Sequence, residues 1–133
     1  MIPRPRPGDY SDYFDGYVAR VPDGDVLQGL RDQRARTAAI VRDAGEEMGD
    51  YAYAALDGSA SRTLSSVVDE YESVRAATLT LFEGLDADAW ARRGSANGAP
   101  VTVASLPWIV LGHDLHHCAM LVERYGLGPD RAG

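Results

Sequence analysis

The carboxy-terminal segment 102–126 reads TVASLPWIVLGHDLHHCAMLVERYG. Its apolar residues recur every three or four positions, which is the spacing of one face of an α-helix. Gly126 follows the pattern at the position where many helices end in a left-handed residue. A helix capped by Ser105 tolerates Pro107 in its first turn, whereas a helix capped by Thr102 is kinked by it. We expect a loose first turn from Thr102 and a kink at Pro107.

Two further stretches show the same periodicity, with charged residues on the opposite face. The first predicts a helix over 25–48, whose first turn Asp23 or Asp25 can cap by accepting backbone amides. The second predicts a helix over 63–85. Segment 94–100 is rich in glycine and small residues, which predicts a loop, and no alternation typical of a useful β-strand is present. The expected fold class is therefore all-α.

The first 24 residues differ in composition from the rest of the chain. Four prolines deny residues 1–24 a long helix. Tyr10, Phe14 and Tyr17 recur at helical spacing, so we expect one or two helical turns that lay aromatic rings on the main body. The chain is thus read as an arm followed by three long helices, the last over 103–125.

Length and charge narrow the class of protein. The chain has 133 residues, 45% of them hydrophobic, a formal net charge of −7 and one cysteine. These values fit a single domain over 1–133 without a disulfide, and we expect it in the cytoplasm. No apolar run is long enough for a membrane span or a signal peptide. We therefore expect no membrane partner, and because the acidic balance repels phosphate backbones, no nucleic acid partner either.

All three histidines of the chain lie in one pentad, HDLHH, on the last predicted helix. His113 and His117 are four residues apart and share a helical face, so two imidazoles can reach one metal ion. His116 lies at the flank of that face. The residues expected to share the face, and to turn the pair toward the bundle core, are Leu106, Ile109, Val110, Met120 and Leu121.

Metal binding and a structural role are about equally supported for this pair. Interior histidines bonded to other side chains would show the same spacing. A catalytic zinc needs three protein ligands. Cys118 is not expected to be the third ligand, because it lies on the far face of the helix and is read as a small buried hydrophobe. The pentad also matches the zincin spacing with Asp114 in the place of the glutamate base, but aspartate reaches less far and only Glu123 follows as an acidic ligand. Asp114 and His116 are catalytic candidates by proximity alone.

A second apolar stripe lies opposite the histidines on this helix. A helix that is apolar on both sides must be buried on both sides. In a chain with three long helices this implies either a partner subunit or a helix packed between the arm and the other two helices. Of the two we expect a homodimer. The stripe consists of Leu111, Leu115, Cys118 and Val122.

Several segments resemble DinB-like (YfiT-like, damage-inducible) proteins. The arm reads PGDY at 7–10 and VPDGD at 21–25, and the later helices read VRAATL at 74–79 and GHDLHH at 112–117. The resemblance implies an up-down four-helix bundle in which three histidines hold a divalent metal, commonly nickel or zinc. It also implies a small-molecule substrate and a metal-dependent hydrolase, or a transferase that uses a thiol cofactor such as bacillithiol or mycothiol. By position, His113 and His117 are two of the ligands.

The chain departs from the family pattern between its first two long helices. The family's second helix, which supplies the first histidine ligand, is missing, so two of three ligands remain and an apolar groove should be exposed. A second subunit can supply the third ligand, from Asp69, Glu72 or another histidine. Alternatively, the chain is a helical binding or dimerisation module without metal, or a degenerate deletion of marginal stability.

Overall fold

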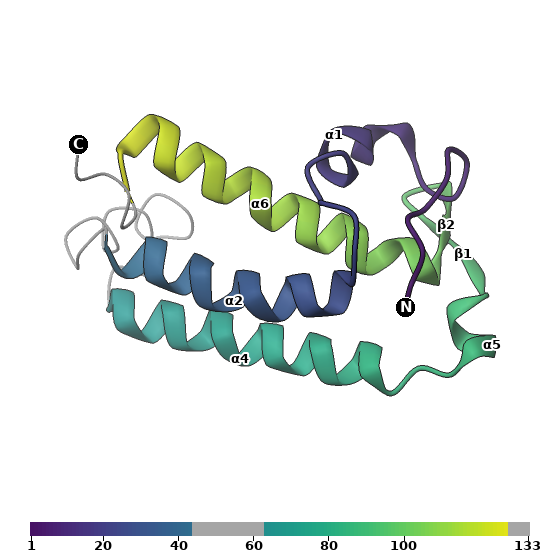
Figure 1. The fold of residues 1–133 in the computed structure, drawn as a ribbon, viewed down its shortest axis with the longest axis horizontal. Coiled ribbons are helices and arrows are strands. Elements are labelled where there is room, and N and C mark those ends of the chain that lie inside the picture. Colours follow the sequence, from purple (N-terminus) through teal and green to yellow (C-terminus); the bar gives the residue numbers. More distant parts are fainter. Residues whose placement is uncertain (44–62, 128–133) are drawn as a thin grey trace.

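The computed structural model describes residues 1–43 and 63–127, and helices dominate it (Figure 1). This confirms the all-α fold class. The long helices are α2 (Val26–Arg42), α4 (Leu64–Glu83) and α6 (Leu106–Tyr125). The shorter elements are a 3-10 turn η1 (Asp12–Phe14), α1 (Asp15–Val18), α5 (Ala87–Trp90), β1 (Arg93–Ala96), β2 (Ala99–Thr102) and a 3-10 turn η2 (Val103–Ser105).

Capping residues fix the ends of the long helices. Asp25 is the N-cap of α2, since its Oδ1 accepts from the backbone N–H groups of Leu27 and Gln28 at 3.1 and 3.3 Å. Asp23, the other candidate, instead pairs with an arginine of the arm. Gly126 ends α6 with φ of 63°, the left-handed conformation that glycine adopts without a steric penalty. The end expected for the first helix, 44–48, lies outside the described residues.

The start of α6 differs from the expectation. Thr102 caps only the 3-10 turn, where its Oγ1 accepts from the N–H of Ser105 at 3.2 Å. The α-helix begins at Leu106, so Pro107 lies in its first turn. The missing N–H of Pro107 therefore removes no helical bond, and the start expected at 103 is wrong by three residues of 3-10 helix.

Segment 94–100 is also corrected, because it is not a loop throughout. Arg93–Ala96 pairs antiparallel with Ala99–Thr102. Asn97 and Gly98 form the turn with positive φ angles of 52° and 78°. An Asn-Gly pair is the usual signal of a two-residue hairpin, and the sequence reading missed it.

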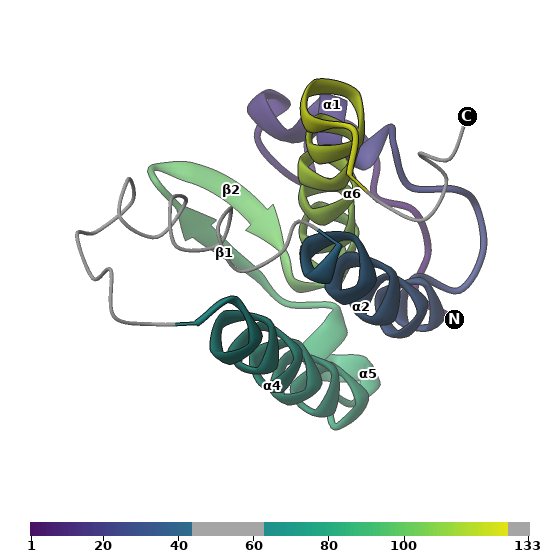
Figure 2. The same ribbon diagram turned by 90° about the vertical axis from the view of Figure 1, so that its left-hand side faces the viewer.

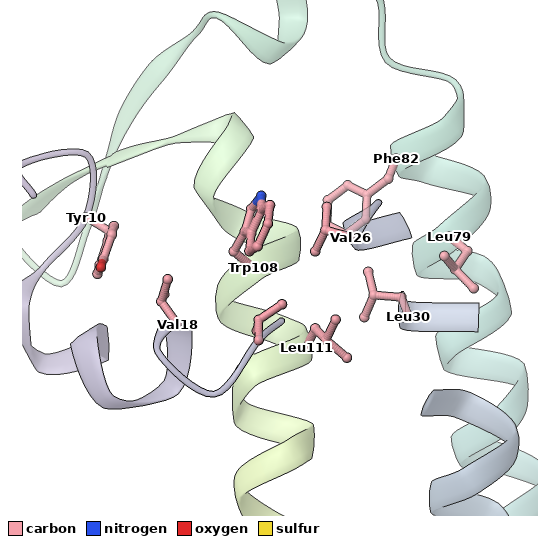
Figure 3. Packing of buried hydrophobic residues seen from close by; sticks show 9 residues of the cluster. Tyr10, Val18, Val26, Leu30, Leu79, Phe82, Trp108 and Leu111 are labelled. Atoms are coloured by element: carbon pink, nitrogen blue, oxygen red, sulfur yellow. The ribbon is translucent and has the colours of Figure 1, made fainter. Parts of the chain in front are cut away.

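The three long helices within 1–43 and 63–127 do not form a closed ring. Seen along its axis, α2 lies between α4 and α6 and packs on both (Figure 2). The main core forms where α2, α4, α6 and the arm meet. In Figure 3, Trp108 and Leu111 of α6 lie between the arm and Leu30 of α2. The buried members of this core are Tyr10, Val18, Val21, Val26, Leu30, Leu79, Phe82, Trp108 and Leu111.

The arm packs on the body, as the aromatic spacing predicts. Tyr10 is buried, and α1 lies against α6. Arg4 anchors the arm, because its guanidinium donates to the carbonyl oxygens of Val18, at 3.0 Å, and Val21. The same guanidinium stacks on the Trp108 ring at 4.6 Å from the centroid. Over residues 1–43 and 63–127, we find no helix with the length and apolar character needed to cross a membrane.

Replacing Arg4 tests this anchor. Arg4→Ala removes charge-assisted hydrogen bonds and the ring contact, so we expect the free energy of unfolding to fall by about 2 kcal/mol in urea denaturation. Arg20→Ala is the control, since Arg20 is an exposed arginine of the same part of the chain and should change stability by less than about 0.5 kcal/mol. Equal effects of the two variants would contradict the anchoring role.

Candidate functional site

The imidazoles of His113 and His117 converge on the outer side of α6. Their Nε2 atoms lie 2.9 Å apart and their ring centroids 4.4 Å apart. The expectation that the pair faces the core is wrong, because both side chains are exposed. The residues expected to share their face are half-buried, while Trp108, Leu111, Asp114 and Cys118 point into the protein.

The separation of the two nitrogens suits a shared ligand atom. Imidazole nitrogens bind zinc at about 2.0–2.1 Å, so two of them at roughly a right angle lie about 3 Å apart. Without metal, one Nε2–H donates to the other Nε2. Burial, and then the neighbouring His117, lower the pKa of His113. The neutral imidazole, which is the form that binds metals, is therefore favoured at this position.

Tyr17 from α1 covers the inner edge of this histidine cluster. Its ring centroid lies 5.0 Å from that of His113 and 5.2 Å from that of His116. Gly112 makes this approach possible, because a Cβ at that position would lie 2.0 Å from the carbonyl oxygen of Tyr17. His116 is thus half-buried beside Tyr17 and does not share the nitrogen contact of the other two histidines.

Asp114 lies between the histidines in sequence but points the other way, into a buried polar network. Its Oδ1 accepts from the hydroxyl of Thr37 of α2 at 2.9 Å. Its Oδ2 accepts from the hydroxyl of Tyr71 of α4 and lies 3.5 Å from the guanidinium of Arg75. The carboxylate is only 8% exposed and faces away from the histidine nitrogens, so in this arrangement it connects helices.

Cys118 belongs to the same network and is buried. Its Sγ lies 3.2 Å from the hydroxyl of Thr37 and accepts from Nε2 of Gln33 at 3.4 Å. Burial raises the pKa of the Cys118 thiol, so the protonated form is favoured. This agrees with its reading as a small buried side chain rather than a ligand.

The described residues supply two converging ligands and not three. Within 1–43 and 63–127, no group of three histidine, cysteine or acidic side chains could hold a metal ion. The candidates for a ligand from a second subunit are engaged within the chain: Arg42 pairs with Asp69 at 3.2 Å and with Glu72 at 2.8 Å. The residues therefore fit part of a metal site, with further positions left for ligands from elsewhere.

Apolar side chains are exposed on α4. The position at which the family's second helix was expected to be missing, between the first two long helices, lies outside the described residues. Val74 is 59% and Leu81 63% exposed. On α6, Val122 from the second apolar stripe is 41% exposed, whereas Leu111 and Cys118 of that stripe are buried. The homodimer stays a prediction.

These features define an all-α protein with a histidine pair on its carboxy-terminal helix. A family model of the DinB superfamily matches residues 10–121, so the chain belongs to this superfamily. The match covers the arm from residue 10, α2, α4 and α6 up to residue 121, including the histidine pentad, and it confirms the resemblance seen in the sequence. Neither the curated proteins nor the solved structures gave a significant match.

Gly112→Ala tests the close approach of α1 to α6. Alanine favours a helix by about 1 kcal/mol, but the new Cβ meets a backbone oxygen that cannot move without α1. The steric term should win, with a loss of about 1–3 kcal/mol in the free energy of unfolding. Gly16→Ala is the matched control, because Gly16 lies in α1 itself with open space around it, and should be neutral or stabilising. A neutral Gly112→Ala would show that the contact is not tight.

Tyr71→Phe tests the buried network through pH. Burial, and then the hydrogen bond to Asp114, raise the pKa of Tyr71 from 10.0 to about 12. A raised tyrosine pKa stabilises the folded state while the phenol is protonated, so this contribution is complete below about pH 10 and is lost toward about pH 12. In urea unfolding, wild type should exceed Tyr71→Phe by about 1–3 kcal/mol at about pH 8. This difference should shrink toward pH 12, and a difference that does not change with pH would contradict the assignment.

Proposed function

We propose that this DinB superfamily protein is a metal-dependent enzyme that acts on a small molecule, as a hydrolase or a thiol-dependent transferase. The observation that supports the proposal is the convergence of His113 and His117, whose Nε2 atoms lie 2.9 Å apart on an exposed side of α6. A divalent ion, nickel or zinc by resemblance to the family, would be held there by these two imidazoles.

Such an ion, when bound, lowers the pKa of a coordinated water or thiol, which is the chemistry that hydrolysis and thiol transfer both need. The chain's own residues provide three conditions for this chemistry. The neutral form of His113 is favoured, both imidazoles are open to solvent and thus to a small molecule, and the network around Asp114 fixes α6 against α2 and α4. Neither Asp114 nor His116 has a contact that favours a role as general base.

A non-catalytic helical module is the second candidate. It is favoured by the exposure of Val74 and Leu81 on α4, together with the lack of a third ligand among the described residues. Exposed apolar side chains on one helix are typical of a surface that binds another protein. In this case the histidine pair would be a hydrogen-bonded pair without metal.

Metal content separates the two candidates. Tag-free protein is incubated with nickel or zinc, desalted and analysed by elemental mass spectrometry. The enzyme proposal predicts about one ion per chain or per dimer, and His113→Ala or His117→Ala should abolish retention because a single imidazole binds too weakly. His116→Ala is the matched control, and it should retain metal because the converging nitrogens remain.

Retained metal that depends on both histidines would justify assays of ester, amide and thiol-transfer substrates with and without the ion. Wild-type protein that retains no metal, or a His113→Ala variant that retains as much as wild type, would contradict the proposal. If wild-type protein retains no metal and His113→Ala unfolds with the same cooperative curve as wild type, the result favours the binding module.

A further inference from the structure

The three histidines and Tyr17 form a closed cluster of four rings. His113 lies between Tyr17 and His117, with centroid distances of 5.0 and 4.4 Å. His116 closes the cluster, at 5.2 Å from Tyr17 and 5.6 Å from His117. The imidazole of His113 therefore has an aromatic neighbour on each side, although it lies on an exposed side of its helix.

The position of Tyr17 is set by the backbone. The lack of a side chain on Gly112, the residue before His113, lets the Tyr17 carbonyl lie against α6. The carbonyl of Val18, the next residue, accepts from Arg4, which holds α1 to the rest of the arm. Two separate contacts of the arm thus place Tyr17 next to His113.

Tyr17 also has an aromatic neighbour within the arm, Tyr13, whose side-chain hydrogen bond raises the pKa of the Tyr17 hydroxyl. The Tyr13 ring contacts Phe14 and Tyr17, and its side chain is 75% exposed. The planes of the Tyr17 and His113 rings are inclined by 50°, so the observed contact is one between the two rings.

We propose that Tyr17 is a positioning residue: its ring holds the His113 imidazole in the rotamer that aims Nε2 at His117, which makes the amino-terminal arm part of the histidine site. An exposed histidine otherwise samples several rotamers, and fixing it on metal binding costs conformational entropy. A ring packed against it before binding removes most of that cost. Residues that orient a ligand in this way typically change metal affinity about 10- to 100-fold when they are replaced.

The rotamer of His113 is measured first, by NMR on the full chain without metal. Wild-type protein should show cross-peaks between the Tyr17 and His113 rings and couplings of one His113 χ1 rotamer. Tyr17→Phe keeps the ring and should keep both signals, whereas Tyr17→Leu should give averaged couplings. Averaged couplings in wild type, or unchanged couplings in Tyr17→Leu, overturn the inference. Circular dichroism confirms that each variant is folded.

Nickel affinity is measured next by titration, and this part rests on the proposed function. Tyr17→Leu should weaken binding about 10-fold or more, while Tyr17→Phe should stay within about twofold of wild type. Tyr13→Leu is the matched control, since it removes an aromatic ring of the same arm that contacts no histidine. Equal losses in Tyr17→Leu and Tyr13→Leu, or a large loss in Tyr17→Phe, overturn the positioning role. Wild-type protein that binds no nickel refutes the proposed function instead, and the rotamer measurement still decides the role of Tyr17.

Discussion

The buried carboxylate of Asp114 connects the three long helices in the described part of the chain. Asp114 of α6 accepts from Thr37 of α2 and from Tyr71 of α4, and Arg75 of α4 provides the nearest positive charge. Burying a carboxylate without partners is very costly, so α6 can rotate little without breaking these contacts. Because α4 and α6 lie on either side of α2, the long side chains of Tyr71 and Arg75 are needed to reach across to Asp114.

The contacts of Asp114 fix the rotation of α6 about its own axis, and this rotation decides which side chains of α6 face solvent and which face the arm. Side chains one residue before and three residues after Asp114 leave the helix on the outer side, and these are His113 and His117. Gly112 then faces the arm, where the lack of a side chain admits Tyr17. The polar network, the histidine pair and the docking of the arm are therefore three consequences of one helix orientation.

Much of the fold follows from local signals in the sequence. Helical periodicity, the cap at Asp25 and the glycine at 126 act within a few residues, so one sequence is enough to read them. The orientation of α6 could not be read in this way, because both of its sides are apolar and a buried aspartate gives no periodic signal. The Asn97-Gly98 turn has the sequence of a two-residue hairpin, but the strands beside it have four residues each and no apolar alternation, so the hairpin was not predicted.

The contact between Asp114 and α4 also decides which side chains of α4 and α6 stay at the surface. Val74 lies within one helical turn of Tyr71 and Arg75 on α4, and His113 and His117 lie within one turn of Asp114 on α6. Because Tyr71, Arg75 and Asp114 turn toward one another, Val74 on α4 and the two imidazoles on α6 are left at the surface. The exposed side chains of both helices thus follow from the same buried contact that fixes their orientation.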